Sequence, residues 1–498
     1  MTALFERQVP ATNASGGVSD LSYTLVQPIE RNKVAADPIK SDDSTGFTSA
    51  AAPPRRLGPL AANLLERLAA ISASGSFVFG MQRGNMEGLA PTFVDCDAAR
   101  WPNGSVAWAG CDSTSHGHRS DVKAASGSQA GLIAYDYDWA IETVNWQDLS
   151  SPSNVSRLVI PPRFDYATFM SAAHAEGALV AMDCPMRNPI TLRDQCDKTG
   201  RPITALLPGG AGHSMWTAWL DGFAAVAAAE AARGDAIIFR LFHEVTRTHC
   251  YWWSQAGEVT PAEYHAAWNY TRWYLEEHRQ VDNLLWVYAP WQPSRYPGKS
   301  FVEWTDGGFY PGDENVDIVS FDNYDVDATF TAGMLNDCRE TVAFAAAHGK
   351  IPVAGEFGTL GGTQNTRMKH FFTDAFLNPV LGDPLCRRIA FALTWANGPM
   401  DYPPAVLLNA SGRHPSNEHY VPVPGDVAYD DFVAFLASNA TLLARDLNRG
   451  VGLKSDDPDE PHGRRPSEDA QELSKVAWSL RLGARASTLR AEKGKLCG

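Results

Sequence analysis

The 498-residue sequence predicts an α/β fold of the (β/α)8, or TIM barrel, class. Short runs of β-branched and aromatic residues alternate with longer alanine- and leucine-containing stretches, a pattern typical of repeated βα units. Each of eight such runs ends in polar or aromatic residues, as expected when the active site lies at the carboxyl ends of parallel barrel strands. The candidate strands are 77–82, 132–138, 178–185, 236–244, 284–291, 316–325, 351–358 and 389–397.

The barrel is expected to fill residues 57–450 as one large domain, since barrels with insertions often reach about 400 residues. Residues 1–56 are rich in Ser, Thr, Ala, Asp and Pro and predict an irregular N-terminal leader. Residues 451–498 contain a charged, proline-bounded linker at 454–461 and then a short helix-forming stretch. We therefore predict a barrel between an irregular leader and a charged C-terminal tail.

The composition argues against two classes of partner. Forty-two basic and 57 acidic residues give a net charge of −15, which repels nucleic acid and anionic lipid but leaves neutral ligands unaffected. No run approaches the roughly 18 apolar residues of a membrane span. Fifteen Trp and 15 Tyr residues provide rings on which neutral sugars can stack. Neither nucleic acid nor a membrane span is expected, and the oligomeric state is left open.

Eight cysteines occur without a CxxC pair, which argues against zinc ribbons and thioredoxin-like chemistry. Disulfides are possible, and Cys96 with Cys111 and Cys184 with Cys196 are near enough in sequence to close short loops. Six N-x-S/T sequons suit a secreted glycoprotein. The N-terminus lacks the basic start and apolar run of a secretory signal. An extracellular or cell-surface location is nevertheless the one we expect.

Two glutamates stand at the ends of the fourth and seventh predicted strands. The run 237–244 delivers His243 and Glu244 to the barrel mouth, and the run 351–358 delivers Glu356. Cleavage of a glycosidic bond needs a protonated carboxyl at the leaving oxygen and a second carboxylate at the anomeric carbon. Strands four and seven lie across the barrel, so their side chains can converge on one sugar. A separation of about 5 to 5.5 Å would give retention of configuration.

In this context the sequence resembles glycoside hydrolase family 26, best known for endo-β-1,4-mannanases. The resemblance covers roughly residues 77–397, and its motifs are specific as an ordered set. They are 240–244 (RLFHE), 251–253 (YWW), 283–290 (NLLWVYAP), 310–324 (YPGDENVDIVSFDNY), 355–358 (GEFG) and 394–397 (TWAN).

The resemblance implies roles for five residues. Glu244 matches the acid/base and Glu356 the nucleophile, while His243 matches the residue that typically precedes the acid/base. Tyr324 matches a tyrosine that hydrogen-bonds the nucleophile, and Trp395 matches the floor of the subsite that holds the reacting sugar. A retaining endo-hydrolase of a neutral β-linked polysaccharide follows, with β-1,4-mannan as the expected substrate.

Two departures from the family pattern bear on specificity. Pro185 stands where a sugar-contacting histidine is usual, although Asn188 is kept, and Asp183 is the candidate replacement for that polar contact. After Glu244, residues 245–250 replace the usual Asn-Gly and Trp-containing sequence, and we expect Arg247 and His249 to point into the cleft. A cation there lowers the pKa of a neighbouring carboxyl, which works against an acid catalyst.

Other candidates carry less weight. Asp136 and Asp138 end the second strand, where either substrate binding or rim structure is expected, and Trp252 of the aromatic run is a candidate for sugar binding. His116 and His118 lack further ligands at metal-binding spacing, so no metal is expected. No dinucleotide fingerprint, P-loop or nucleophile elbow is present, so no cofactor is expected either.

Two alternative functions remain open. The same barrel would act on β-1,3-xylan or a mixed-linkage β-glucan if Pro185 changes the sugar that binds beside the glutamates. A weakly active carbohydrate-binding or structural barrel is the other alternative, motivated by the changes at Pro185 and Arg247. The presence of both Glu244 and Glu356 argues against this last interpretation.

Overall fold

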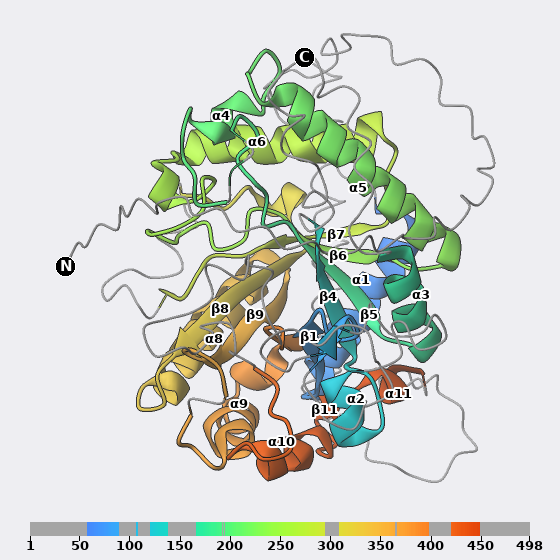
Figure 1. Cartoon of the computed structure of the whole chain (residues 1–498), viewed down its shortest axis with the longest axis vertical. Coiled ribbons are helices and arrows are strands. Elements are labelled where there is room, and N and C mark those ends of the chain that lie inside the picture. Colours follow the sequence, from blue (N-terminus) through green and yellow to red (C-terminus); the bar gives the residue numbers. More distant parts are fainter. Residues whose placement is uncertain are drawn as a thin grey trace, which may run out of the picture. The chain divides into compact units, whose positions relative to one another are not determined.

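Eight parallel strands close into a barrel in the computed structural model, since β1 pairs with both β4 and β10 (Figure 1). The structure describes residues 57–88, 106–107, 120–137, 166–191, 193, 195–293, 308–363, 366–397 and 420–448. The barrel strands are β1 (Phe77–Gln82), β4 (Leu132–Asp136), β5 (Leu179–Asp183), β6 (Ile237–Arg240), β7 (Leu284–Tyr288), β8 (Ile318–Asp325), β9 (Ile351–Thr359) and β10 (Phe391–Thr394). The predicted (β/α)8 fold is confirmed, with each predicted strand in its expected place.

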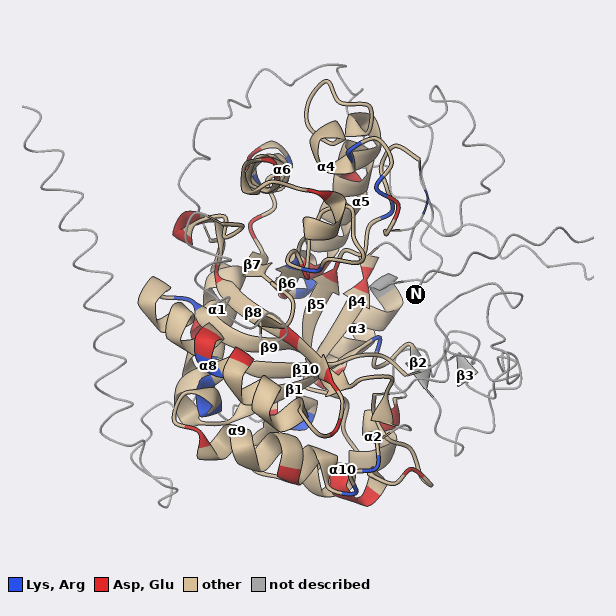
Figure 2. Cartoon of the chain, turned by 90° about the vertical axis from the view of Figure 1, so that its left-hand side faces the viewer, with Lys and Arg blue, Asp and Glu red and all other residues tan. Residues whose placement is uncertain are grey.

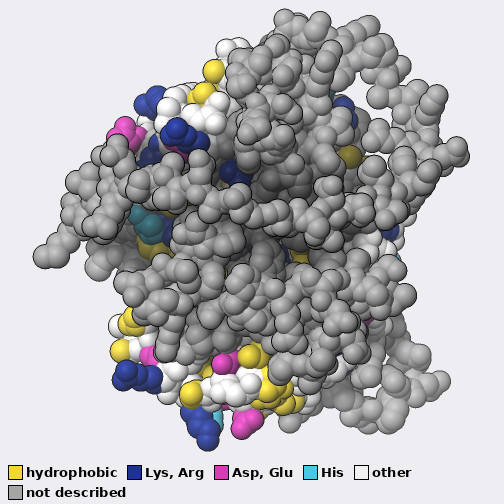
Figure 3. All heavy atoms as spheres, in the orientation of Figure 1, with side chains coloured by type: hydrophobic (Ala, Val, Ile, Leu, Met, Phe, Trp, Pro, Cys, Tyr) yellow, Lys and Arg dark blue, Asp and Glu magenta, His cyan; other side chains and the backbone are white. Residues whose placement is uncertain are grey.

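Helices cover the outside of the barrel, and α8 packs against both β8 and β9 (Figure 1). None of the helices in the described ranges is long and apolar enough to cross a lipid bilayer. Hydrophobic, acidic and basic side chains are interspersed over α9 and α10 on the face in Figure 3. The helices are α1 (Pro59–Ser74), α2 (Asp121–Ser126), α3 (Tyr166–Glu176), α4 (Pro202–Ala205), α5 (His213–Arg233), α6 (Pro261–Trp273), α8 (Phe330–His348), α9 (Asn378–Gly382), α10 (Tyr429–Leu436) and α11 (Ala444–Asn448).

Local sequence explains where the helices begin and end. Helix α6 starts with a capping box, in which the Thr260 hydroxyl accepts from the Glu263 N–H while the Glu263 carboxylate accepts from the Thr260 N–H. Pro261 follows at the first helical position, where its missing N–H costs no hydrogen bond. Helices α5 and α8 end at Gly234 and Gly349, both in the left-handed conformation that glycine adopts without steric cost.

The strands alternate between an inner and an outer face. The inner positions carry small or branched residues such as Val78, Leu132, Ile238 and Val353, which pack with α1 in one buried cluster. The outer positions carry larger rings that pack under the helices, as when Phe239 meets Trp286 at 5.0 Å between ring centroids. By this alternation the last residues of several strands point into the barrel mouth.

Further strands lie beside the barrel that the sequence did not predict. Strand β11 (Thr441–Leu442) pairs with β1 in parallel, and the antiparallel pair β2 (Glu87–Gly88) and β3 (Val106–Ala107) lies apart from the sheet. Two-residue strands are too short to show a hydrophobic period. The predicted leader and tail, Asp138, Cys96, Cys111, His116 and His118 lie outside the described residues, and the domain bounds stay a prediction.

Two disulfides are present in the described part of the chain, Cys196–Cys250 and Cys338–Cys386. The suggested pairing of Cys184 with Cys196 is therefore wrong. Cys184 is buried directly after β5, whereas Cys196 lies in the following loop and reaches the loop after β6. Nearness in sequence favoured the short loop, but the barrel places the β5 and β6 loops side by side. The expectation of disulfides itself is confirmed.

A bulge in β9 changes which face of the barrel Glu356 occupies. Phe321 of β8 pairs with Ala354, but the next residue, Asp322, pairs with Glu356, so Gly355 is an extra residue. If residues 353–356 alternated regularly, without a bulge, Val353 would face inward and Glu356 would lie on the outer face. A Cβ atom on Gly355 would lie 2.6 Å from Asp322 Oδ1 and 2.8 Å from Ser320 Oγ, so glycine is required by close approach.

Replacing Gly355 by alanine tests this packing. We expect Gly355→Ala to lower the free energy of unfolding by about 1 to 3 kcal/mol, because the new methyl group must displace Asp322 or the strand. Urea denaturation followed by tryptophan fluorescence measures the change. Gly382→Ala is the matched control, because a Cβ there meets no atom within 4 Å. Equal stability of the two variants would contradict the role of Gly355.

Candidate active site

Charged residues from five strands meet at the carboxyl end of the barrel. Asp136, Asp183 and Arg240 end β4, β5 and β6 and are neighbours in register, and Asp322 of β8 is the partner of Glu356 in β9. All five are buried. Figure 2 shows acidic and basic positions close together at the ends of β4, β5 and β6. Buried charges of opposite sign this close must compensate one another.

Arg240 binds three of these carboxylates. Its Nη2 donates to Asp322 Oδ1 and Oδ2 at 2.9 and 2.8 Å, and its Nη1 donates to Glu356 Oε1 at 2.9 Å. The same Nη1 contacts Asp183 Oδ1 at 3.0 Å and Oδ2 at 3.1 Å. The rigid fork of the guanidinium thus links carboxylates from β5, β8 and β9.

One guanidinium faces more negative charge than it can neutralise. Burial raises the pKa of Asp183 to about 8 against the opposing effect of Arg240, and Glu356 and Asp136 add to the rise. Burial likewise raises the pKa of Asp322 well above its usual range, with Glu356 acting in the same direction. A proton on Asp183 or Asp322 is therefore favoured near neutral pH. Asp183, predicted as a sugar contact, is placed here as a ligand of Arg240, and the predicted contact stays untested.

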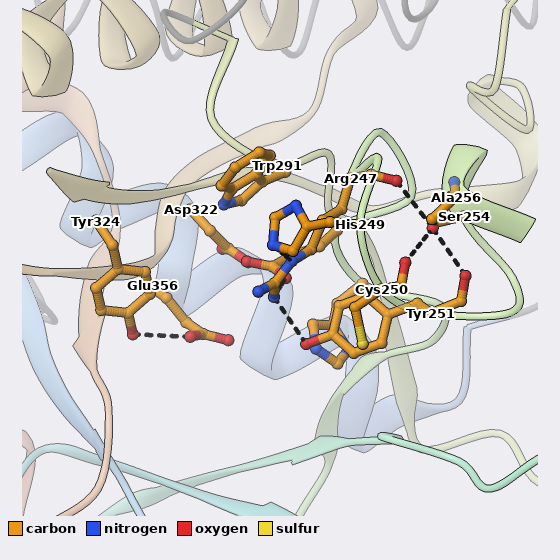
Figure 4. Close-up of polar contacts among 12 residues, drawn as sticks. Arg247, His249, Cys250, Tyr251, Ser254, Ala256, Trp291, Asp322, Tyr324 and Glu356 are labelled. Atoms are coloured by element: carbon orange, nitrogen blue, oxygen red, sulfur yellow. Dashed lines mark hydrogen bonds and ion pairs between the residues drawn. The ribbon is translucent and has the colours of Figure 1, made fainter. Parts of the chain in front are cut away.

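Glu356 has a donor on each carboxylate oxygen. Besides Arg240 on Oε1, the Tyr324 hydroxyl donates to Oε2 at 2.8 Å (Figure 4). Burial, and then the charge of Glu356, raise the pKa of Tyr324 well above its usual value, so the phenol keeps its proton and donates. The Tyr324 ring packs edge-on against Tyr420 at 5.3 Å. Both oxygens of Glu356 are thereby fixed in direction, as a nucleophile requires.

Glu244 lies in a tight turn that begins where β6 ends. Phe242 and Glu244 both have a φ of 51°, in the left-handed region that non-glycine residues rarely occupy. The Arg247 N–H closes the turn on the Glu244 carbonyl at 2.9 Å. Such backbone strain recurs at active sites, where the surroundings hold it in place. The turn brings Glu244 back over the barrel mouth instead of outward along the strand.

Arg247 contacts the Glu244 carboxylate directly. Its Nη1 donates to Glu244 Oε2 at 2.5 Å and to the Tyr251 hydroxyl at 3.2 Å, and its Nε donates to His249 Nε2 at 2.7 Å. The guanidinium carbon also lies 5.1 Å from the Tyr251 ring centroid and 5.6 Å from that of Trp291, within cation–π distance. Figure 4 shows this group on one side of the site, with Tyr324 and Glu356 on the other.

Two opposing effects set the acidity of Glu244. Burial raises its pKa, Arg247 lowers it, and the charge of Glu356 raises it again, with a net upward shift. A buried carboxyl whose pKa is raised can hold a proton near neutral pH and donate it. Glu244 is therefore suited to general acid catalysis, and Arg247 is the group that limits this acidity.

The loop after β6 is held from several sides. The Ser254 hydroxyl lies 2.6 to 2.9 Å from the carbonyls of Arg247, Cys250 and Tyr251 (Figure 4). The backbone N–H of Trp291 donates to Thr246 Oγ1 at 2.9 Å. The Cys196–Cys250 disulfide ties this loop to the one after β5. These bonds hold Glu244 and Arg247 in position from outside the barrel.

His243 and Trp252 are both buried near Glu244. Burial, with Arg240 and Arg247, lowers the pKa of His243 well below its usual value, so the imidazole is neutral. Its ring packs against Tyr251 at 5.0 Å, and its carbonyl accepts from Trp253 Nε1 at 2.8 Å. Trp252 is fully buried and donates Nε1 to the Met186 carbonyl at 2.8 Å. The structure thus places Trp252 as a support between two loops, and its predicted sugar contact is untested.

Asn188 is fully buried and organises the loop after β5. Its Oδ1 accepts from Ile190 N at 2.8 Å, and its Nδ2 donates to the carbonyls of Asp197 and Thr199 at 2.9 and 3.0 Å. All of these partners lie within the same loop. The predicted contact of Asn188 with substrate stays a prediction, whereas its role in loop structure is visible.

Trp395 lies one residue beyond β10, partly exposed, at the rim of the barrel. The guanidinium of Arg83 lies 5.9 Å from the Trp395 ring centroid, and Arg83 Nε forms an ion pair with Asp136 at 3.3 Å. Asp136 also accepts from Gln82 Nε2 at 2.8 Å. The indole is thus partly exposed beside the charged strand ends, and its predicted role as the floor of a sugar subsite stays a prediction.

Sequence reasoning missed Arg240 and Asp322 as site residues. Both lie within the family-like motifs, yet neither received a role. A signal was available in the sequence, because Arg240 interrupts the apolar run 237–242 and Asp322 directly follows the run 318–321, so both are charges on predicted buried strands. Charges on buried barrel strands need partners, and the nearest ones are the other strand ends.

The fold and this site resemble those of one class of protein, the (β/α)8-barrel glycoside hydrolases with carboxylates at the fourth and seventh barrel strands. The model of glycosyl hydrolase family 26 matches residues 199–372 of the chain. Over 344 residues the chain is 26% identical to a mannan endo-1,4-beta-mannosidase of Bifidobacterium adolescentis, covering 66% of this chain and 32% of that protein. A second relative, from Caldalkalibacillus mannanilyticus, is 25% identical, with 53% of this chain and 50% of that protein covered. The chain thus spans a third to a half of these relatives.

Solved structures agree with this assignment. An endo-beta-1,4-mannanase double mutant from Cellulomonas fimi matches with a TM-score of 0.61 at 26% identity, covering 78% of this chain and 77% of that one. The catalytic domain of a Bacillus sp. JAMB-750 endo-beta-1,4-mannanase also has a TM-score of 0.61, at 25% identity, covering 82% and 98%. The predicted resemblance to glycoside hydrolase family 26 is confirmed.

Removing Arg247 should change how the reaction depends on pH. In the predicted role of general acid, Glu244 must be protonated to act, so its pKa would govern the alkaline limb of kcat/KM. Arg247→Gln removes the cation that lowers this pKa while burial and Glu356 continue to raise it. We expect the alkaline limb to move to higher pH, as measured by initial rates across the pH range.

The control for this experiment is Arg279→Gln. Arg279 is exposed on the outer helical layer and makes an ion pair with Asp221 at 3.4 Å. Its replacement should leave the limb in place. A limb that stays fixed or moves to lower pH in Arg247→Gln would refute the assignment of Glu244 as the acid.

Proposed function

We propose that the chain is a retaining endo-β-mannanase that cleaves β-1,4-mannan by double displacement. The observation that carries the proposal is the different setting of the two strand-end glutamates. Glu244 is buried beside Arg247, and its pKa is raised. Glu356 is oriented by donors from Arg240 and Tyr324. Family 26 similarity supports the same pair of roles.

In the first step Glu356 attacks the anomeric carbon, and the bond to the leaving oxygen breaks as Glu244 donates its proton to that oxygen. The shortened chain leaves with its new hydroxyl, and a glycosyl ester on Glu356 remains. In the second step Glu244, now a carboxylate, takes a proton from water while the water oxygen displaces Glu356. The configuration is retained because two inversions occur.

The surrounding groups support both steps. Arg240 and Tyr324 each donate a hydrogen bond to one oxygen of Glu356, which holds the carboxylate in one orientation. Little reorientation is then needed before Glu356 attacks the anomeric carbon. Arg247 is suited to stabilise the Glu244 carboxylate formed in the first step, because its guanidinium already contacts Oε2. A location outside the cell is part of the proposal, since two disulfides suit an oxidising compartment.

Two alternative functions differ from this proposal in the polysaccharide that is cleaved or in whether any is cleaved. β-1,3-xylan or mixed-linkage β-glucan would be preferred if Pro185, which replaces a polar residue typical of the family, reshapes the glycone side. A weakly active binding or structural barrel would bind mannan without turnover. The setting of Glu244 and Glu356 favours an active enzyme over this last alternative.

The two glutamates should respond differently to substitution. Glu356→Ala should abolish the release of reducing sugar from mannan. Glu244→Gln should lower kcat on mannan by roughly 10² to 10⁴-fold, the usual contribution of a general acid. Glu244→Gln should leave the rate of the first step unchanged on an aryl mannoside whose leaving group needs no protonation. Reducing-sugar assays and release of the aryl group measure these effects.

Glu277→Gln is the control, because Glu277 is exposed on the outer layer. Assays on mannan, β-1,3-xylan and mixed-linkage glucan in parallel identify the preferred polymer. Full activity of Glu356→Ala on every polymer would refute the double displacement. Binding of mannan with no turnover at high protein concentration would favour the structural alternative.

A further inference from the structure

Arg247 has donor capacity that the proposed hydrolysis does not use. Nη1 contacts Glu244 and Tyr251, and Nε contacts His249, but within the described ranges Nη2 has no protein partner. The side chain is 26% exposed, whereas that of Arg240 is 1% exposed. One edge of the Arg247 guanidinium is therefore available to a ligand.

The charge balance around Arg247 also differs from that around Arg240. Arg240 faces three carboxylates, but Arg247 forms an ion pair with Glu244 alone among the described residues. Glu244 must be protonated before it can act as the acid, and it then no longer neutralises Arg247. A largely enclosed guanidinium without a counter-ion is unfavourable. An anionic group on the substrate would remove this cost.

The position of Arg247 indicates which part of a substrate it meets. Arg240 and Tyr324 contact Glu356, whereas Arg247 contacts Glu244. The acid donates to the leaving oxygen, so the groups beside Glu244 lie next to the leaving sugar. Trp291 flanks the guanidinium at 5.6 Å, and His249 packs edge-on against Trp291 at 5.2 Å. These contacts hold the guanidinium in a fixed orientation.

We propose that Arg247 binds a carboxylate on the leaving-side sugar, so that the preferred substrate is a β-mannan with acidic substituents. This inference rests on the proposed function and specifies its substrate. A carboxylate matches the planar fork of a guanidinium with two parallel hydrogen bonds. By drawing Arg247 away from Glu244, it would also remove the effect that lowers the pKa of the acid. Substrate binding would thereby favour the protonated, active form of Glu244.

The test uses two polymers that differ in charge alone. One is β-mannan carrying carboxymethyl groups, and the other is its carboxamidomethyl form at the same degree of substitution. The protein has a net charge of −15, so assays are run at 0.15 M salt, where the Debye length is about 8 Å and long-range repulsion is screened. For the wild type we expect kcat/KM to be about tenfold higher on the charged polymer, as one charge-assisted contact would give.

Three variants make the result specific to this arginine. Arg247→Gln should lose the preference for the charged polymer, and Arg247→Lys should retain part of it because a lysine keeps the charge without the fork. Arg279→Gln should keep the wild-type ratio, since it removes an equal charge from the outer layer. If Arg247→Gln does not fold, as judged by circular dichroism, the test rests on the ratio of kcat/KM between the charged and uncharged polymers in the wild type and in Arg247→Lys.

Two results would overturn the inference while leaving the proposed function intact. One is equal cleavage of both polymers by the wild type. The other is an unchanged ratio in the Arg247 variants. Absence of cleavage on these polymers and on unsubstituted mannan would instead refute the proposed function, and the inference would fall with it.

Discussion

Arg240 binds carboxylates from β5, β8 and β9 inside the barrel mouth, and the geometry of the site depends on this contact. A buried guanidinium or carboxylate without a partner costs several kcal/mol, so each member of the group stabilises the others. The bulge at Gly355 belongs to the same constraint, because it turns Glu356 inward and lets Asp322 approach the β9 backbone. The position of Glu356, the proposed nucleophile, is thus tied to the packing of the barrel itself.

Glu244 is positioned by a different kind of structure. It follows the end of β6 in a left-handed turn, and its loop is fixed by Ser254, by the buried Trp252 and by the Cys196–Cys250 disulfide. Glu356, the proposed nucleophile, is therefore held by charges inside the barrel, whereas Glu244, the proposed acid, is held by a loop that other loops and the disulfide fix in place. Variation in that loop can alter acidity and leaving-side specificity without disturbing the Arg240 contacts, which is how the unusual Arg247 can coexist with an otherwise family-like core.

Much of the fold could be predicted from the sequence, because buried parallel strands leave long apolar runs that end in polar residues. The same pattern located Glu244 and Glu356. Local patterns could not show the bulge at Gly355. A bulge changes which face the following residues of the strand occupy, but the sequence reads the same whether or not Gly355 is paired. The partner of Cys196 also depended on which loops the barrel places together. Arg240 stood within a quoted motif, but its three partners lie far from it in sequence, so its role required the closed barrel.

Glu356, oriented by Arg240 and Tyr324, is the proposed nucleophile of a double displacement. Covalent trapping tests this role most directly. The protein is incubated with the fluoride of a 2-deoxy-2-fluoro manno-oligosaccharide, which slows hydrolysis of the glycosyl ester, and is then digested for peptide mass spectrometry. We expect one added glycosyl group per chain, located on Glu356. A label on Asp183, Asp322 or Glu244 would contradict it.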